Sequence, residues 1–401
     1  MSAEHDIWLS LVLGYANSAV SKIYEMFGSA KGFFDYAEGR KEIIAPLTKA
    51  QKNRIHKIKA SDVSHILEKC EQNRIYTVAF DDKRYPSRLK ELPNPPAVLY
   101  VKGEMPDFDN ECTLTIVGPR KVSEYGAKAA FSLSRRLAAA GCLIVSGGAV
   151  GADEYAHKGA LSIEGKTVAI LGCGIDNDYP KENKELRERI ANSGCLISEY
   201  PPEYPALPTN YPRRNRILSA ISVGVVVVEA AAKSGALITA GYAAEQGRDV
   251  FVIPGSPSLP EYEGSNRLIK DGANPLLSAA DLLEVYFPIF PNKIDLEKAL
   301  KIKNGSEDFN RENKKSISEK ENTEKAVSGE SKAPTKPSEE EFSLLTDDAR
   351  KIILSEIPQT FTVDDAVAAT GLDIGNTLSA LTELEINGLI KTMPGARYQK
   401  I

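Results

Sequence analysis

Three arginines stand within four positions in the stretch NYPRRNRILSAIS, residues 210–222. Arg213 and Arg216 are three apart and should share one face of a helix, whereas Arg214 should point elsewhere. Cations near the start of a helix are opposed by the helix dipole, which favours negative charge there. The pattern therefore predicts an anion-binding site, although a solvated, charged helix start also accounts for it.

Segments rich in glycine and small residues follow several short apolar runs and supply a second kind of anion-binding group. Glycine lets the backbone approach a ligand closely, and exposed N–H groups at helix starts attract phosphate. Neither G-x-G-x-x-G nor G-x-x-x-x-G-K-[ST] is present, so the sequence carries no dinucleotide or ATP fingerprint. Glycines that only make tight turns are the alternative. The candidate residues in these segments are Gly118, Arg120, Gly147, Gly148, Lys181, Ser234 and Gly235.

Tyr211, two positions before Arg213, offers a ring on which a nucleobase could stack, an interaction worth about 1–3 kcal/mol. A tyrosine that packs in the core is the alternative. Residues 112–290 hold 18 Lys and Arg against 19 Asp and Glu, so positive potential must be confined to a patch. The net charge of the 401-residue chain, −5, also gives no sign of a polyanion partner.

An enzyme that hydrolyses a nucleotide bond is a second interpretation of the same region. Asp153 and His157 are four apart on a predicted helix, and Glu199 and Glu229 end predicted strands, so together they could act as acid and base. However, no spaced set of nucleophile, base and orienting residue occurs, and no metal cluster is evident. Asp153 and His157 are better explained as an internal helix pair or a loop anchor, so we expect no catalysis and no cofactor.

The order of the elements predicts the fold. Over residues 112–290, short apolar runs alternate with amphipathic segments of helix length, six times in succession. Runs without polar alternation are typical of strands that are covered on both faces. This pattern predicts an α/β fold, a Rossmann-like, doubly wound, mainly parallel sheet, in which ligands bind beyond the carboxyl ends of the strands.

The remaining segments predict smaller parts. Residues 1–75 read as helices, the first of which ends at Gly28, and residues 76–111 as a proline-rich connection, mostly loop with one strand. Residues 291–342 are dense in Lys, Glu, Ser and Asn and predict a disordered linker. Residues 343–401 predict three helices and a two-stranded wing, the layout of a winged helix.

The winged-helix part has an unusual charge for a DNA-binding module. Residues 343–401 hold eight acids and five bases, and the presumed recognition helix, residues 373–388, has no Lys or Arg. Because phosphate contacts need cations, we expect this part to contact a protein.

The five cysteines form no C-x-x-C pair and predict buried, reduced thiols in a cytosolic protein. The N-terminus does not resemble a secretory signal, and the longest apolar run is too short to span a membrane. We therefore expect a cytoplasmic protein with no membrane partner.

These segments together resemble the DNA-processing protein A family of bacteria. The similarity is carried by IVGPRKVSEYG, VSGGAVGADEYAHKGAL, LGCGIDNDYPKEN, YPRRNRI, VVVVEAAAKSGALITAGYAAEQGRDVFVIPG and GSNRLIKDGA, in this order. The resemblance implies a protein without enzymatic activity that binds and shields single-stranded DNA during natural transformation. It further implies that the protein helps to load the RecA recombinase and acts as a homodimer through the sheet domain.

The resemblance also implies a set of DNA contacts. Arg120, Lys181, Arg213, Asn215 and Arg216 would grip the strand, and Gly147, Gly148, Ser234 and Gly235 would contribute backbone groups. Pro119 departs from the Ser or Thr usual in the family, which removes a hydroxyl and an N–H donor from the loop of Gly118 and Arg120. Tyr211 replaces a common Phe, which retains stacking.

Overall fold

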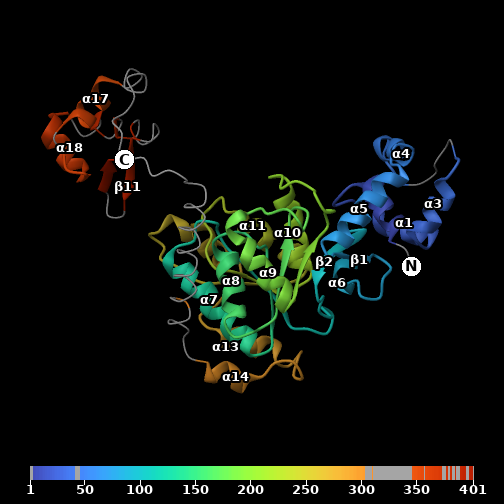
Figure 1. Ribbon diagram of the computed structural model, residues 1–401. Helices are drawn as coiled ribbons and strands as arrows, with labels where there is room; N and C mark the ends of the chain where they lie inside the picture. Colours follow the sequence, from blue (N-terminus) through green and yellow to red (C-terminus); the bar gives the residue numbers. More distant parts are fainter. Residues whose placement is uncertain are drawn as a thin grey trace. The chain divides into compact units, whose positions relative to one another are not determined.

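The computed structural model of the chain describes residues 3–40, 46–302, 309, 346–355, 357–372, 376–377, 380–381, 384, 389–393 and 397–400 (Figure 1). The chain divides into two compact units, Met1–Lys320 and Glu321–Ile401, and each is described by itself. Most of the predicted linker over 291–342 and most of the predicted helix over 373–388 lie outside the described residues.

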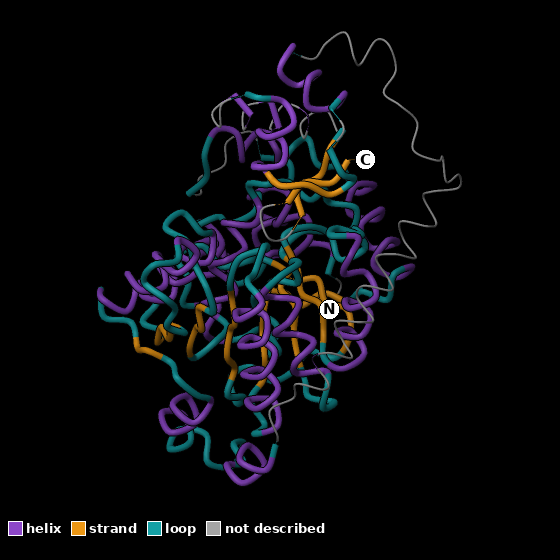
Figure 2. The backbone as a smooth tube through the Cα atoms, turned by 90° about the vertical axis from the view of Figure 1, so that its left-hand side faces the viewer, coloured by secondary structure: helices purple, strands orange, loops and turns teal. Residues whose placement is uncertain are grey.

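The first unit is built on a mixed, mainly parallel sheet, as the sequence predicts. Nine described strands pair in the order β1-β2-β6-β5-β4-β3-β7-β8-β9, and β3 to β8 are the six predicted strands. Only the pairs β1–β2 and β2–β6 are antiparallel. Figure 2 shows the strands running side by side. Their bounds are β1 (Tyr76–Ala79), β2 (Val98–Gly103), β3 (Thr113–Val117), β4 (Leu143–Ser146), β5 (Thr167–Leu171), β6 (Cys195–Ser198), β7 (Gly224–Val227), β8 (Asp249–Val252) and β9 (Asn274–Pro275).

Strand β3 lies next to β4, the middle strand of the sheet, and the direction of winding reverses at β3. Leu114 of β3 pairs with Ile144 of β4 on one side and with Gly224 of β7 on the other, both in parallel register. From β3 the chain winds through β4 and β5 to β6, then crosses back to β7 and β8. Such a reversal leaves room for a ligand beyond the carboxyl ends of the strands.

Helices cover both faces of the sheet. On one face, α7 (Glu124–Ala139), α8 (Ala152–Leu161) and α13 (Ala279–Tyr286) bury apolar side chains against β3, β4 and β7. On the other face, α10 (Asn210–Ala220) and α11 (Gly235–Glu245) pack on β4, β5 and β7. The remaining helices of this part are α6 (Ser87–Lys90), η1 (Lys181–Asn183), α9 (Lys184–Ser193), η2 (Pro260–Tyr262) and α12 (Glu263–Lys270).

The N-terminal part is helical, but its first predicted helix is two helices. The described ones are α1 (Glu4–Leu13), α2 (Ala19–Phe27), α3 (Ala30–Ala37), α4 (Lys49–Ile55) and α5 (Ala60–Gln72). The break between α1 and α2 comes at Gly14, whose φ of 76° ends the helix, and Ala16 also has a positive φ, 52°. Apolar side chains of these helices share one hydrophobic core with β2, β5 and β6, so the N-terminal part packs directly against the sheet.

Two further expectations need correction. The proline-rich connection contains β1 and the short helix α6 besides the one predicted strand. Helix α14 (Leu296–Lys301) lies within the predicted linker, so the prediction of disorder is wrong for these residues. The cause is packing: Ala299 of α14 and Ile294 are buried in the core beneath α7 and α13.

The second unit has the elements of a winged helix. Helices α17 (Asp347–Leu354) and α18 (Val363–Thr370) were predicted, and so were the antiparallel strands β11 (Ile390–Met393) and β12 (Arg397–Lys400). A third strand, β10 (Thr360–Thr362), also pairs with β12. Thr362 caps α18, because its Oγ1 accepts a hydrogen bond from the Asp365 N–H at 3.2 Å.

Candidate nucleic-acid interface

Helix α10 separates the three arginines of the sequence motif. It begins at Asn210, whose side chain donates to the carbonyl of Gly172 at 2.9 Å and so ties the helix start to the loop after β5. Arg213 is exposed, whereas Arg214 and Arg216 are 4% and 2% exposed. The expectation that Arg213 and Arg216 face a ligand together is therefore wrong for Arg216.

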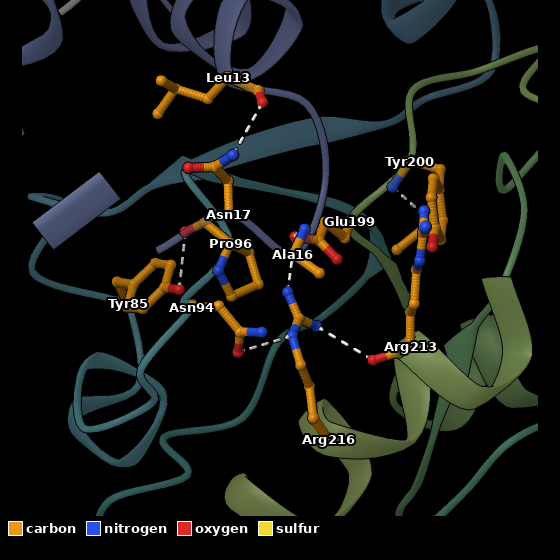
Figure 3. A network of polar contacts seen from close by, with 11 residues as sticks. Leu13, Ala16, Asn17, Tyr85, Asn94, Pro96, Glu199, Tyr200, Arg213 and Arg216 are labelled. Carbon is orange, nitrogen blue, oxygen red and sulfur yellow. Dashed lines mark hydrogen bonds and ion pairs between the residues drawn. The ribbon is translucent and has the colours of Figure 1, made fainter. Parts of the chain in front are cut away.

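Arg216 is turned inward onto a carboxylate (Figure 3). Its Nη2 lies 2.7 Å from Oε1 of Glu199, and both side chains are about 95% buried. Its Nε donates to Asn94 at 3.1 Å, and the backbone N–H of Ala16 donates to the same Glu199 oxygen at 2.9 Å. Arg216 therefore joins α10, β6 and the N-terminal part instead of meeting solvent.

Arg214 is buried beneath the ends of β4 and β5. Its Nη1 donates to the carbonyl of Gly147 at 2.8 Å and to that of Ile170. Asp153 lies next to it and accepts hydrogen bonds from the N–H groups of Gly147 (3.1 Å) and Ala149 (3.4 Å). A Cβ at Gly147 would collide with both side chains, 2.5 Å from Arg214 and 2.6 Å from Asp153, so glycine is required here by packing. Burial raises the pKa of Asp153, and the Arg214 charge opposes that rise.

A small hollow opens between the strand ends and α10, with a volume of about 20 Å³. That is room for about one water molecule, so the hollow cannot enclose a nucleoside. A ligand held there must lie across its mouth. The lining residues are Arg120, Gly147, Gly148, Ala149, Val150, Leu171, Gly172, Cys173, Tyr179, Pro180 and Tyr211.

An arginine and two tyrosines form the rim of this hollow. Arg120 is exposed, donates to the Tyr179 hydroxyl at 3.0 Å and lies 5.1 Å above the Tyr211 ring. The centres of the two rings are 5.9 Å apart. Tyr211 is half-buried against Gly172, where an added Cβ would lie 3.0 Å from its ring. The rim thus combines a cation with aromatic faces, the combination that binds single-stranded nucleic acid in other proteins.

The loop after β4 offers two backbone donors, of which Gly148 was predicted and Val150 was not. The Gly147 N–H already donates a hydrogen bond to the Asp153 carboxylate. The N–H groups of Gly148 and Val150 have no hydrogen-bond partner within the described ranges and line the hollow. Gly148 has a φ of 67°, which favours glycine, and a Cβ added at Gly118 would lie 2.5 Å from the Ala152 Cβ. Backbone conformation and packing therefore also account for these two glycines.

The other predicted residues, Lys181, Asn215, Ser234 and Gly235, do not line the hollow. Lys181 is exposed at the start of η1, two residues after Tyr179, and forms no ion pair with any described residue. Asn215 is half-buried and accepts from Arg214 at 3.3 Å. Ser234 caps α11, where its Oγ accepts from the Ala236 N–H at 3.3 Å, and Gly235 is exposed with open space around it. Neither Ser234 nor Gly235 lines the hollow, so their backbone contacts to DNA stay a prediction.

The four side chains of the hydrolase interpretation are not brought together. Glu199 follows β6 and Glu229 follows β7, four strand spacings away, which is roughly 19 Å at about 4.8 Å each. Glu229 is buried and accepts hydrogen bonds from Ser123 at 2.5 Å and Tyr262 at 3.0 Å. His157 is fully buried, with Nδ1 2.8 Å from the Thr167 hydroxyl, and burial lowers its pKa to about 3. These groups serve as internal anchors.

Sequence reasoning missed Tyr179, Val150 and the role of Arg214. Tyr179 could have been found, because it precedes Lys181 by two positions in the same loop. Within the ranges that the structure describes, no three His, Cys, Asp or Glu side chains are grouped to hold a metal ion. All five cysteines are free and buried. Among the helices described, none is both long and apolar enough to cross a membrane.

The fold and the rim define a class of protein: a Rossmann-like α/β protein with a cationic, aromatic binding surface at the carboxyl edge of its sheet. The family model of DNA recombination-mediator protein A matches residues 76–287, and that of the DprA winged helix domain matches residues 332–396. Protein Smf from Synechocystis is 37% identical over 339 residues, 83% of this chain and 82% of that protein. The chain therefore belongs to the DNA recombination-mediator protein A family.

Other relatives and solved structures agree with this membership. DNA processing protein DprA from Bacillus subtilis is 39% identical over 219 residues, 55% of this chain and 74% of that protein. The X-ray structure of DprA from Streptococcus pneumoniae is similar with a TM-score of 0.61 and 32% identity, over 71% of this chain and 98% of that one. The structure of DNA processing protein A from Helicobacter pylori, which was solved to describe its single-stranded DNA binding mode, is similar with a TM-score of 0.50 and 29% identity. The match covers 54% of this chain and 97% of that one.

Proposed function

We propose that this chain binds single-stranded DNA, without sequence preference, across the mouth of the hollow between β4, β5 and α10. The observation that carries the proposal is the rim itself, where exposed Arg120 lies above the ring of Tyr211 and next to Tyr179. Arg213 and Lys181 are the exposed cations on the flanking elements. Family membership and the strand-binding Helicobacter pylori relative support the same ligand.

The geometry favours a strand over a duplex or a mononucleotide. The hollow is too small to enclose a nucleoside, and the aromatic faces need an unpaired base to stack on. The open N–H groups of Gly148 and Val150 suit phosphate oxygens, which every sequence offers.

We further infer, on the strength of the family resemblance, that the bound strand is shielded and handed to the RecA recombinase during natural transformation. In this proposal the protein is a cytoplasmic homodimer without catalytic activity, and its acidic winged-helix unit contacts a protein. A RecA-loading assay on strands coated with single-strand binding protein tests the transfer, and sedimentation velocity tests the dimer. RecA loading at the unassisted rate would argue against the transfer.

A gel-shift titration with single- and double-stranded oligonucleotides at two salt concentrations tests the binding. We expect the single strand to bind more tightly at both, with an affinity that falls as salt rises. The recovered oligonucleotide should be intact, because no cleavage step is proposed. Equal affinity for both forms, or no binding at low salt, would contradict the proposed function.

A further inference from the structure

Three tyrosines gather at the end of β6, next to the proposed DNA path. Tyr200 and Tyr204 follow β6, and Tyr15 comes from the break between α1 and α2. The centres of the Tyr200 and Tyr204 rings are 4.9 Å apart in a stacked arrangement. Tyr15 lies 4.7 Å from Tyr200 and 5.0 Å from Tyr204. The cluster therefore joins the sheet to the N-terminal helical part.

Core packing explains Tyr200, which is fully buried, but not the exposed parts of the other two rings. Tyr15 and Tyr204 are half-buried and belong to none of the main apolar clusters of the unit. The Tyr200 side chain is fully buried, yet its hydroxyl has no hydrogen-bond partner among the described residues. The partly exposed rings of Tyr15 and Tyr204 are therefore the part of the cluster that a ligand can reach.

The cluster continues the rim of the hollow. The carbonyl of Tyr204 accepts from the Gly174 N–H at 3.0 Å, in the same loop as Gly172, which lines the hollow. Asn210, three residues before Arg213, donates to the carbonyls of Gly172 at 2.9 Å and Pro205 at 3.3 Å, so the first turn of α10 contacts both the loop of the hollow and the segment of Tyr204. Figure 3 shows the Arg213 side chain extending toward Tyr200. Burial raises the pKa of Tyr200, and the charges of Arg216 and Arg213 oppose the rise.

The charges around the cluster are compatible with a polyanion. Arg54 donates to the carbonyl of Leu13, two residues before Tyr15, at 3.1 Å. The carboxylates of Glu199 and Glu203 have cationic partners, whereas Asp176 accepts a hydrogen bond from the Glu203 N–H at 2.8 Å. Glu199 pairs with Arg216, and Glu203 lies 2.7 Å from Lys69 and 2.8 Å from His65.

We propose that Tyr15 and Tyr204 form a second base-stacking platform, so that single-stranded DNA runs from the hollow past Arg213 onto the N-terminal helical part. This inference rests on the proposed function and extends its site. The ends of β3 and β6 are three strand spacings apart, about 14 Å. At about 3.4 Å between successive nucleotides, a strand of roughly four nucleotides spans about 10 Å and covers the hollow without reaching the platform, whereas a longer strand reaches it.

Oligothymidylates of four to twelve nucleotides, titrated against the full chain, measure the contribution of the platform. Tyr15→Leu and Tyr204→Leu should each weaken binding of the long oligonucleotides about fivefold or more, with no change in salt slope and no effect on the shortest. Tyr15→Phe should restore the affinity, because it keeps the ring. Tyr242→Leu is the matched control, since Tyr242 is also half-buried but lies near the far end of α11.

Photo-cross-linking of the unaltered protein to an oligonucleotide that carries 5-iodouracil removes any dependence on how the variants fold. Cross-links in the peptides of Tyr15 or Tyr204, together with those of Tyr179 or Tyr211, support the platform. Cross-links confined to Tyr179 and Tyr211, with full affinity of the leucine variants, overturn the platform but leave the proposed function intact. Absence of binding at low salt overturns both.

Discussion

The three arginines of α10 have different surroundings, and these decide what each residue can do. Arg214 meets two backbone carbonyls next to Asp153, and Arg216 meets Glu199. These groups relieve most of the conflict between the cations and the helix dipole without any ligand. Arg213 alone is exposed and available to a phosphate.

The buried pair predicts a large difference in stability between two arginine variants. Arg216→Ala leaves Glu199 buried without its cation, so we expect a loss of about 3–5 kcal/mol in the free energy of unfolding. Arg213→Ala should change it by less than about 0.5 kcal/mol, because the side chain is exposed. Urea titrations measure both values. Equal stability of the two variants would mean that Arg216 is not buried against Glu199 in solution.

His157 predicts a particular dependence of stability on pH. Burial lowers its pKa from 6.5 to about 3, so the unfolded chain takes up a proton at a higher pH than the folded one. Its contribution to stability is therefore complete above pH 6.5 and is lost progressively as the pH falls toward 3. His157→Gln should reduce the loss of stability between pH 7 and pH 4, measured by urea unfolding, while DNA affinity at pH 7 is unchanged. An unaltered pH profile would speak against a buried, neutral imidazole.

At the scale of elements, the ends of β4 and β5 and the start of α10 act as one assembly. Arg214 bridges the carbonyls of Gly147 and Ile170, and Asp153 holds the β4 loop from the side of α8. The position of Tyr211 depends on this assembly, because its ring rests on Gly172.

Substitution of Gly172 should move that ring. A Cβ in Gly172→Ala would lie 3.0 Å from Tyr211, so the ring must shift by a few tenths of an ångström, and we expect single-strand affinity to fall about two- to fivefold. Gly241→Ala is the control, because Gly241 lies in α11 with nothing within 4 Å. That variant should keep its affinity and gain up to about 1 kcal/mol of stability. The same affinity in both variants would show that Tyr211 does not hold a base.

The sequence predicts elements better than it predicts which side chains face solvent. The six apolar runs identify β3 to β8 because strands covered on both faces need continuous apolar residues. Helical spacing could not identify the exposed side of α10, since carbonyls and a carboxylate from distant segments bury Arg214 and Arg216. Asn94 and Ala16, which complete that burial, are more than 100 positions away from Arg216 in the chain.

At the scale of the whole chain, the two compact units differ in the chemistry that they offer to DNA. The rim, formed by Arg120, Tyr179 and Tyr211, belongs to the first unit. The exposed cations on the flanking elements, Arg213 and Lys181, belong to it as well. Residues 343–401 hold eight acids against five bases, and phosphate binding needs a local excess of cations. The first unit should therefore carry DNA binding by itself.

A chain shortened to residues 1–320 tests this division. Its single-strand affinity and salt slope, measured by fluorescence anisotropy, should agree with those of the full chain within about twofold. A tenfold or larger loss of affinity would assign phosphate contacts to the winged-helix unit instead.

The salt dependence of single-strand affinity tests the central claim most directly, because it counts the phosphates that the protein neutralises. Each phosphate contact on a single strand contributes about 0.7 to the slope of log affinity against log salt concentration. The triple variant Arg120→Ala, Lys181→Ala and Arg213→Ala should therefore lose about 2 from the slope of the full chain. A slope equal to that of the unaltered protein would show that the strand binds elsewhere.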